Sequence, residues 1–285
     1  MNIRSVKVVI PAAGLGTRLL PMTKEVPKEM LPIPFKNKDN RFFLKPMLQT
    51  IFEQLYDSGF REYIFIGGRG KRVIEDHFTP DEDFLIYLKN NKKEYLVSEL
   101  EEFYSKINDS SLIFVNQPKP KGFGDAVYRA KMFTKDEAYL LHAGDDIVVS
   151  SQPTHFRKLF EIFRYYEADV VFLVEEIEDP RMYGVIVGDE VEPWVFRVRE
   201  MIEKPKVPTS HLAAIAIYIF KPIIYTAIEK VKPDAKGEIQ LTSALQLLLK
   251  WKCKVYALKL DSTERRIDIG TAESYLNTLT NVLAF

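Results

Sequence analysis

The stretch Val6-Lys-Val-Val-Ile-Pro-Ala-Ala-Gly-Leu-Gly-Thr-Arg18 joins an apolar run to a turn of small residues. The apolar run, Val6 to Ile10, predicts a buried strand. The glycines after it let backbone N–H groups approach an anion closely, and Arg18 and the later Lys28 add full positive charge. This combination predicts a turn that binds a polyphosphate at the end of a strand.

The spacing excludes two familiar phosphate-binding motifs. The dinucleotide fingerprint G-x-G-x-x-G would need a glycine in place of Leu19. A Walker A loop would need Gly-Lys-Ser or Gly-Lys-Thr after four intervening residues, and that sequence does not follow here. The turn therefore needs another explanation.

Short apolar runs alternate with helical patterns through the first part of the chain. The runs that predict buried strands are Val6–Ile10, Tyr63–Gly67, Leu112–Asn116, Tyr139–Ala143 and Asp169–Val174. Apolar residues spaced for one helical face lie between them, at Leu48, Ile51, Phe52, Leu55 and Tyr56, and again at Phe156, Leu159, Phe160 and Phe163. This alternation predicts an α/β fold with a doubly wound, mostly parallel mixed sheet flanked by helices.

The second part of the chain is richer in strands. Predicted strands are Gly184–Gly188, Val195–Glu203, Leu212–Phe220 and Val255–Leu260, and the apolar spacing predicts helices around residues 241–248 and 272–279. No linker rich in Gly, Ser or Pro interrupts the chain, so we expect one domain over residues 1–285. A charged helical excursion at residues 80–110 is interpreted as a solvated flap or as part of an oligomer interface.

The composition narrows the class of protein. Forty basic and forty acidic side chains cancel, so nothing argues for nucleic acid or a charged membrane surface as a partner. The single cysteine, Cys253, excludes an internal disulfide, and His77, His142, His155 and His211 lack the spacing of a zinc site. The longest apolar run, Leu212–Phe220, is too short to span a bilayer, and no signal-peptide segment precedes the first strand. We expect a cytoplasmic protein.

The motifs together resemble a known family. They are Ala12–Arg18, Thr23–Pro32, Gly68–Phe78, Lys121–Ala126, Gly144–Asp146, Tyr183–Val185, Glu203–Pro205, Glu238–Thr242 and Asp268–Gly270. In this order they resemble the sugar-1-phosphate nucleotidyltransferases, and among these the bacterial-type UTP–glucose-1-phosphate uridylyltransferases. The resemblance implies a Rossmann-like, glycosyltransferase-A-like fold, with a nucleotide-binding half at about residues 1–150 and a sugar-binding half at about residues 151–285.

Two segments need comment against that resemblance. Residues 35–43 form an insertion where the family usually has a shorter segment, which leaves the motifs intact but affects local loop geometry and assembly contacts. The turn Gly67-Gly-Arg-Gly-Lys71 has the composition of a phosphate cradle. The family has a comparable turn that leads into a helix, so we interpret this one as structural.

The implied reaction explains the residue types. A sugar 1-phosphate oxygen attacks the α-phosphorus of a nucleoside triphosphate, and pyrophosphate leaves. The second pKa of a phosphomonoester is about 6, so the nucleophile is largely ionised at neutral pH and needs no general base. Catalysis must come from cations, backbone N–H groups and a metal that offset the repulsion between two polyanions.

The resemblance assigns the phosphate and metal ligands. Arg18 and Lys28 would hold the triphosphate together with the turn at Gly16 and Thr17, whereas Lys24 is left open. Lys204 would bind the sugar phosphate. The metal ligands would be Asp145 and Asp268, because Mg²⁺ takes few protein oxygens and completes its shell with phosphate and water.

The base and the sugar have their own candidates. The Gln117 amide offers a donor and an acceptor, which matches the O4 and N3–H edge of uracil or thymine, and glycine at Gly122 lets its backbone approach the base. The backbone of Ala12, Ala13 and Gly14 would line the other side of the base. The sugar candidates are Gly184, Glu203, Lys204 and Asp146, of which the last either contacts the sugar or caps a turn. The role of Gln240 is left open.

The prediction is therefore an enzyme that makes UDP-glucose and pyrophosphate from UTP and glucose 1-phosphate with Mg²⁺, and that forms a homo-oligomer, a dimer or a tetramer. The nearest rival is a thymidylyltransferase, or an enzyme that accepts both UTP and dTTP. A nucleotide-sugar sensor or regulatory subunit should lack a phosphate-binding cation or a metal carboxylate, yet all are present. A glycosyltransferase would leave the triphosphate-binding turn unexplained.

Overall fold

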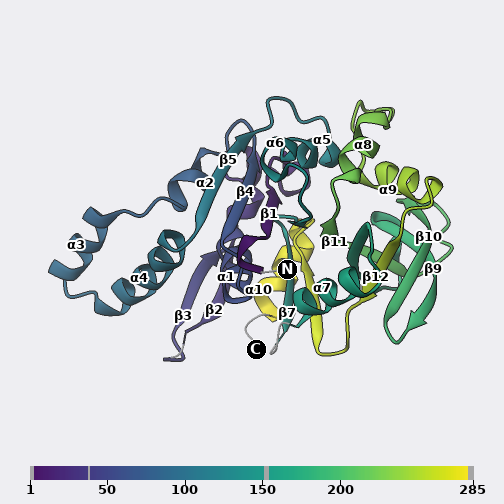
Figure 1. Cartoon of the computed structure of the whole chain (residues 1–285). Helices are drawn as coiled ribbons and strands as arrows, with labels where there is room; N and C mark the ends of the chain where they lie inside the picture. Colours follow the sequence, from purple (N-terminus) through teal and green to yellow (C-terminus); the bar gives the residue numbers. More distant parts are fainter. Residues whose placement is uncertain (1–2, 38, 151–153, 282–285) are drawn as a thin grey trace.

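The strand that carries the glycine turn lies inside a nine-stranded sheet (Figure 1). The computed structural model describes residues 3–37, 39–150 and 154–281. In sheet order the strands are β5 (Ser111–Asn116), β4 (Glu62–Gly67), β1 (Lys7–Pro11), β6 (Tyr139–His142), β11 (Leu212–Phe220), β8 (Val170–Glu176), β12 (Val255–Lys259), β10 (Val195–Glu203) and β9 (Gly184–Glu192). Only β10 and β11 run against the other strands of this sheet. The predicted doubly wound, mixed sheet is confirmed.

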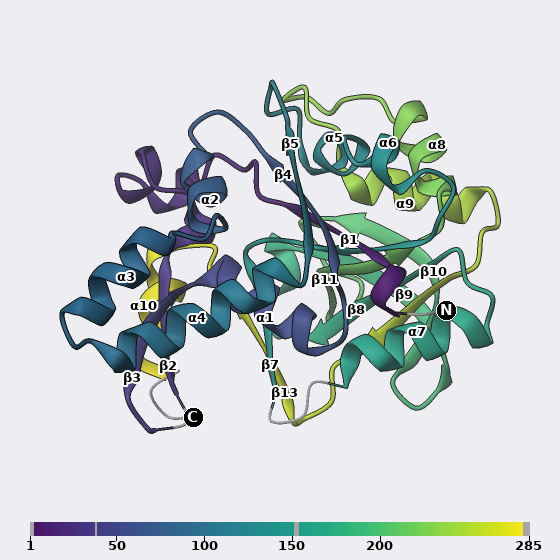
Figure 2. The ribbon, with the colours of Figure 1, turned by 60° about the vertical axis from the view of Figure 1, so that its left-hand side comes forward.

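Helices cover both faces of the sheet, which explains why its strands are almost continuously apolar. Val8 and Ile10 of β1 face one buried cluster and Val9 faces the other. The first cluster includes side chains of α1 (Met47–Asp57), α3 (Glu82–Asn90), α4 (Glu94–Asn108) and α7 (His155–Tyr165). The second includes side chains of α5 (Phe123–Tyr128), α8 (Ile223–Lys230) and α9 (Leu241–Lys250). Figure 2 shows these two helical layers above and below the sheet.

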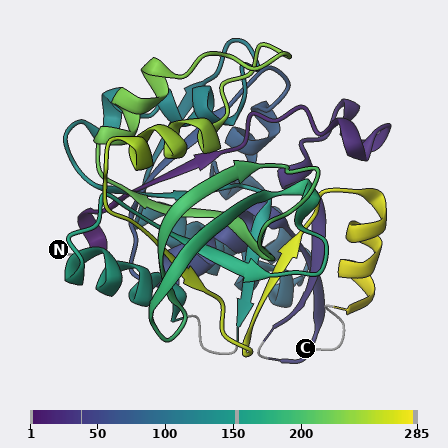
Figure 3. The same ribbon diagram turned by 90° about the vertical axis from the view of Figure 1, so that its right-hand side faces the viewer.

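The β9–β10 hairpin curls back over the sheet, as Figure 3 shows. Besides its ladder with β10, β9 pairs with β11 at Val185 and Ala213. This second pairing brings Gly184, at the start of β9, and its partner Glu203, at the end of β10, next to the amino end of β11. The curl thereby carries part of the predicted sugar site toward the carboxyl ends of the parallel strands.

Two small antiparallel pairs complete the strands. The hairpin of β2 (Pro32–Lys36) and β3 (Phe42–Pro46) contains the predicted insertion at 35–43, of which residue 38 lies outside the described residues. The other pair joins β7 (Asp146–Ser150) to β13 (Glu264–Asp268), with Asp146 directly opposite Asp268. Neither pair was predicted. The second one places two distant acidic motifs side by side.

The remaining helices connect these layers. They are α2 (Arg72–His77), α6 (Lys131–Thr134), α10 (Ala272–Asn281) and the short 3₁₀ turns Ile3–Ser5, Thr17–Leu19, Met22–Lys24, Lys28–Met30 and Pro180–Met182. The excursion at 80–110 is helical as predicted, and α3 and α4 each bury one side of the helix. Within the described ranges every helix is too short or too polar to cross a bilayer. The division into a nucleotide half and a sugar half concerns ligands and stays a prediction.

Candidate functional site

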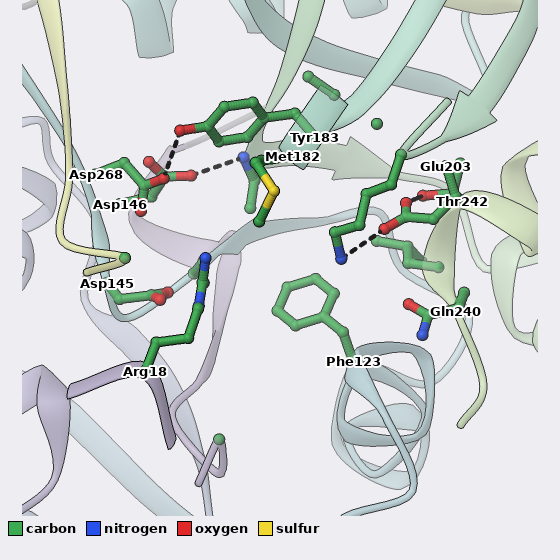
Figure 4. Close-up of a pocket in the computed structure, with 18 of the residues that line it drawn as sticks. Arg18, Phe123, Asp145, Asp146, Met182, Tyr183, Glu203, Gln240, Thr242 and Asp268 are labelled. Atoms are coloured by element: carbon green, nitrogen blue, oxygen red, sulfur yellow. Dashed lines mark hydrogen bonds and ion pairs between the residues drawn. The ribbon is translucent and has the colours of Figure 1, made fainter. Parts of the chain in front are cut away.

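A cavity of about 630 Å³ opens beside the glycine turn. It is lined by residues that follow β1 and β6, by the ends of β10 and β13, by the starts of β7, β9 and α9, and by side chains along β11. Predicted site residues among them are Gly14, Gly16, Thr17, Arg18, Lys28, Asp145, Asp146, Gly184, Glu203, Lys204 and Asp268. Figure 4 shows Arg18 reaching into this cavity, with Asp145, Asp146 and Asp268 to one side and Glu203 to the other. Segments far apart in sequence thus converge on one hollow.

The glycine turn is held in a conformation that favours glycine. Gly16 has a φ of 63°, and the Thr23 hydroxyl donates a hydrogen bond of 2.7 Å to its carbonyl oxygen. A Cβ on Gly16 would lie 3.0 Å from the Thr23 Cβ, so a side chain would meet both strain and a contact. Further round the cavity, a Cβ on Gly270 would lie 3.3 Å from Arg18 Nη1. Glycine at 270 therefore leaves room for the Arg18 guanidinium.

Lys28 forms an ion pair with Asp145 at the floor of the cavity. Burial favours the neutral amine, but the negative charges of Asp145 and Glu29 outweigh it and raise the pKa of Lys28. Burial likewise opposes ionisation of Asp145, and the Lys28 ammonium nevertheless holds the pKa of that carboxyl below its usual value. Both groups therefore stay charged at neutral pH. Lys71 pairs at 2.8 Å with the buried Glu29, so the predicted structural role of the turn Gly67–Lys71 agrees with the structure.

A buried arginine organises the acidic side of the cavity. Arg266 donates to Asp146 at 2.5 and 3.0 Å and to Glu175 at 2.7 Å, and its Nη2 lies 3.8 Å from Asp268 Oδ2. The Tyr183 hydroxyl donates to the same Asp268 oxygen at 3.0 Å. Burial raises the pKa of Asp268, and the charges of Asp146 and Asp145 add to the rise against the opposing effect of Arg266.

These carboxylates fit a hard divalent cation. Asp145 and Asp268 line the same cavity, and the charge of Asp145 contributes to the raised pKa of Asp268. No group of three or more His, Cys, Asp or Glu side chains with metal-binding geometry occurs in the described ranges. A cation here would therefore take few protein oxygens and fill its shell from a ligand and water, as Mg²⁺ prefers.

The opposite side of the cavity presents an acid–base pair. Glu203 accepts a hydrogen bond of 2.5 Å from the Thr242 hydroxyl and lies 3.0 Å from Lys204 Nζ. Lys204 has a φ of 42°, which is uncommon for a residue with a side chain. Such strain is often retained where a side chain must be aimed at a ligand. A Cβ on Gly184 would come within 3.6 Å of Glu203, so the glycine keeps this side of the cavity open.

The predicted base-reading residues lie just beyond the cavity lining. Gln117 is 5% exposed, and its Nε2 donates to Asp125 at 2.7 Å and to the Gly122 carbonyl at 3.3 Å. Gly122 has a φ of 96°, and a Cβ there would lie 2.8 Å from the Ile239 backbone. Ala12 and Ala13 are also buried rather than on the cavity surface. Among the residues predicted to surround the base, Gly14 therefore lines the cavity together with the phosphate, metal and sugar candidates, whereas the other base candidates do not.

The contacts of Asp146, Lys24 and Gln240 bear on their predicted roles. Both oxygens of Asp146 are committed to Arg266, and Oδ2 also accepts from the Ala216 amide, which leaves little of it for a sugar. Lys24 is exposed beside Glu25 and does not line the cavity. Gln240 lines the cavity and donates to Asp234 and Glu238.

Arg266 was not predicted as a site residue. It shares a strand face with Asp268 two residues later, but this follows only once Glu264–Asp268 is known to be a strand.

Nearly the whole chain matches one family model. The nucleotidyl transferase model aligns with residues 7–284. The chain belongs to the nucleotidyl transferase family. The predicted membership of the nucleotidyltransferases is thereby confirmed, and the protein is an enzyme.

Its relatives narrow the family further. It is 34% identical to a putative UTP–glucose-1-phosphate uridylyltransferase of Bacillus subtilis, over 97% of this chain and 96% of that protein. It is 36% identical to the UTP–glucose-1-phosphate uridylyltransferase of Staphylococcus epidermidis, over 95% of this chain and 90% of that protein. The crystal structure of a UDP-glucose pyrophosphorylase complexed with UDP-glucose superposes with a TM-score of 0.82 at 30% identity, covering 98% of both chains.

Proposed function

We propose that this nucleotidyl transferase converts UTP and glucose 1-phosphate into UDP-glucose and pyrophosphate. The observation that carries the proposal is one cavity in which Arg18 and Lys28 face Asp145 and Asp268, with Glu203 and Lys204 at the other side. Relatives named for this reaction align over nearly the whole chain. A putative glucose-1-phosphate thymidylyltransferase of Bacillus anthracis, at 21% identity and a TM-score of 0.70, shares the fold. That likeness supports the fold alone and gives no support to thymidylyl transfer.

The chemistry needs positioning and charge rather than proton transfer. A phosphate oxygen of glucose 1-phosphate forms a bond to the α-phosphorus of UTP, and the bond from that phosphorus to the bridging oxygen of the β-phosphate breaks. Pyrophosphate carries the electron pair away. Because the attacking phosphate is already largely ionised at neutral pH, the absence of histidine and serine from the residues that line this cavity is consistent with the reaction.

In this proposal the cations divide the phosphates between them. Arg18 and the turn at Gly16 and Thr17 bind the β- and γ-phosphates, where backbone N–H groups and the guanidinium offset the charge of the leaving group. Lys204, on the opposite side, binds the phosphate of the sugar. Lys28 lies between the turn and Asp145 and is suited to a non-bridging oxygen of the α-phosphate.

Asp145 and Asp268 would hold Mg²⁺. The ion would act as a Lewis acid on phosphate oxygens and screen the two polyanions from each other. The ion pair between Lys28 and Asp145 supports this assignment, because a carboxylate that pairs with one cation could exchange it for another. Glu203, oriented by Thr242, is suited to accept hydrogen bonds from sugar hydroxyls.

Two further predictions belong to the same proposal. A homo-oligomer, dimer or tetramer, is consistent with exposed apolar side chains on the β2–β3 hairpin and on α3: Phe42, Leu44, Phe84 and Tyr87. A cytoplasmic location agrees with a metabolic nucleotide as substrate. Sedimentation of the purified protein tests the first, and cell fractionation tests the second.

Pyrophosphate release tests the function. Purified protein is assayed with UTP, dTTP, CTP, ATP and GTP, each with glucose, galactose and mannose 1-phosphates. The proposal predicts the highest kcat/KM for UTP with glucose 1-phosphate. Equal rates with dTTP would establish dual specificity, a preference for dTTP would establish a thymidylyltransferase, and bound nucleotide without any turnover would support a sensor.

A further inference from the structure

Asp125 fixes the orientation of the side chain that is proposed to read the base. Its carboxylate is 5% exposed and accepts a 2.7 Å hydrogen bond from Gln117 Nε2. Arg129, one helical turn further along, donates through Nη2 to Asp125 Oδ1 at 2.7 Å and through Nε to Oδ2 at 3.4 Å. The carboxylate oxygens accept hydrogen bonds from these donors, so the Gln117 amide turns its NH₂ group toward Asp125.

The contacts of Gln117 leave one atom for a ligand. Its NH₂ group has two hydrogens, and these are directed at Asp125 Oδ2 and at the Gly122 carbonyl. No residue in the described ranges donates to Gln117 Oε1. From the sequence we predicted that this amide donates to O4 and also accepts from N3–H. Since both of its hydrogens are bound within the protein, only Oε1 is free to contact the base, as an acceptor.

Gln117 lies close to the turn that lines the cavity. A Cβ on Gly68 would lie 3.6 Å from both the Ala13 Cβ and the Gln117 carbonyl, so the two residues flank the same glycine. Phe123, at the start of α5, lines the cavity itself. Asp125 follows on the same short helix, whose first turn packs closely against the Ile239 backbone.

We propose that Asp125 is a positioning residue for base selection: it holds Gln117 with Oε1 toward the base, as an acceptor for the N3–H of uracil. This inference rests on the proposed function. Uracil and thymine carry a hydrogen on N3, whereas N3 of cytosine is an acceptor and would face Oε1 lone pair to lone pair. Asp125 thereby excludes cytosine without touching the nucleotide.

The variant Asp125→Asn tests this role because its outcome is set by Arg129. Arg129 only donates, and its shorter contact is with Oδ1 (2.7 Å, against 3.4 Å to Oδ2), so the asparagine oxygen takes the Oδ1 position and its NH₂ group faces Gln117. We expect the Gln117 amide to rotate and accept from that NH₂ group, giving up its 3.3 Å contact with the Gly122 carbonyl and presenting its own NH₂ group to the base. We expect the ratio of kcat/KM for UTP to that for CTP to fall on the order of tenfold or more.

The matched control is Arg129→Gln, which removes the ion pair but leaves the carboxylate facing Gln117. Its ratio of UTP to CTP should equal that of the wild type. A purely structural role for Asp125 would lower both rates together in Asp125→Asn, and an unchanged ratio would overturn the proposal. Wild-type protein without activity on UTP would instead refute the proposed function, so the two failures are distinguishable.

A second measurement needs no variant and applies even if Asp125→Asn does not fold. In 3-methyl-UTP a methyl group replaces the N3 hydrogen. Wild-type protein with Oε1 toward the base should reject this analogue, with a loss in kcat/KM on the order of tenfold or more relative to UTP. Turnover of 3-methyl-UTP at the rate of UTP would show that Gln117 does not accept from N3 and would overturn the assigned orientation.

Discussion

Arg266 is the residue on which the acidic side of the cavity depends. It is nearly buried, and it satisfies Asp146 and Glu175 while lying close to Asp268. Removing one partner of a buried ion pair is costly because the remaining charges stay behind without water. The cavity therefore needs this arginine before it can hold its proposed ligands.

Replacing Arg266 by Met should lower the free energy of unfolding by about 3–5 kcal/mol, because Asp146 and Glu175 lose their buried partner. Denaturant unfolding measures it. The matched control is Arg199→Met, whose partner Asp189 lies 2.8 Å away with both side chains more than half exposed. That change should cost no more than about 1 kcal/mol. Equal losses in the two variants would contradict the account.

At single positions, the sequence predicted those site residues that belong to short motifs. Arg18, Asp145 and Glu203 line the cavity as expected, because they follow the glycine turn or lie at or just beyond the ends of strands of the large sheet. Lys28 and Asp268 line it as well. The hydrogen bond from Gln117 to Asp125 could not be predicted. It depends on the rotamers of two side chains and not on residue type or spacing.

Among the elements, the start of α5 shows how tightly the base loop is packed. A Cβ on Gly124 would lie 2.8 Å from the Ile239 carbonyl oxygen, a contact with backbone that cannot swing aside. The amide of Gly124 donates to the same oxygen at 2.8 Å. The start of α5 and the segment at Ile239 are thus in direct backbone contact, and a side chain at position 124 would push them apart.

The change Gly124→Ala should lower the free energy of unfolding by about 1–3 kcal/mol through overpacking, and should weaken UTP binding by moving the loop that carries Gly122. Thermal unfolding and nucleotide titration measure the two effects. Gly67→Ala is the control, since its Cβ would meet only Lys71 Cβ at an ordinary 3.5 Å. A Gly124→Ala protein with wild-type stability and affinity would refute this packing argument.

The β7–β13 pair is the element that sequence patterns missed. Glu264-Arg-Arg-Ile-Asp268 is mostly charged, so its apolar pattern does not mark a strand. Its register sets Asp146 opposite Asp268, and directly opposed like charges are unfavourable unless a cation offsets them. Arg266, on the same strand, supplies that charge.

Across the whole molecule, the alternation of strands and helices predicted the layers because each central strand buries both faces. The antiparallel direction of β11 and its contact with β9 were not predictable, because the partner of a strand depends on residues far away in the sequence. Those two features bring Gly184 and Glu203 to the cavity. The pairing of strands that are far apart in the sequence therefore determines which motifs lie together in the cavity.

The acid stability of the folded chain should reflect two histidines, the buried His142 and the half-buried His77. Burial lowers the pKa of both His77 and His142 to about 4. An unfolded histidine takes up a proton below about pH 6.5, so as the pH falls from there to about 4 each histidine reduces the free energy of unfolding by up to about 1.4 kcal/mol per pH unit. Stability is full above this window.

Denaturant unfolding at a series of pH values checks this prediction. In His77→Gln the dependence between pH 6.5 and 4 should become shallower, because one of the two contributions is gone. Thr280→Ala changes an exposed residue that does not titrate and should leave the slope unchanged. An identical slope in His77→Gln and the wild type would show that His77 is not the half-buried neutral group described here.

The most direct measurement is Mn²⁺ binding in the presence of UTP, followed by electron paramagnetic resonance, because the account requires two carboxylates of one cavity to share an ion. Asp145→Asn and Asp268→Asn should each weaken binding on the order of tenfold or more. The control Asp179→Asn, at an exposed site paired with Arg181, should bind as the wild type does. Unchanged Mn²⁺ affinity in both cavity variants would contradict the account.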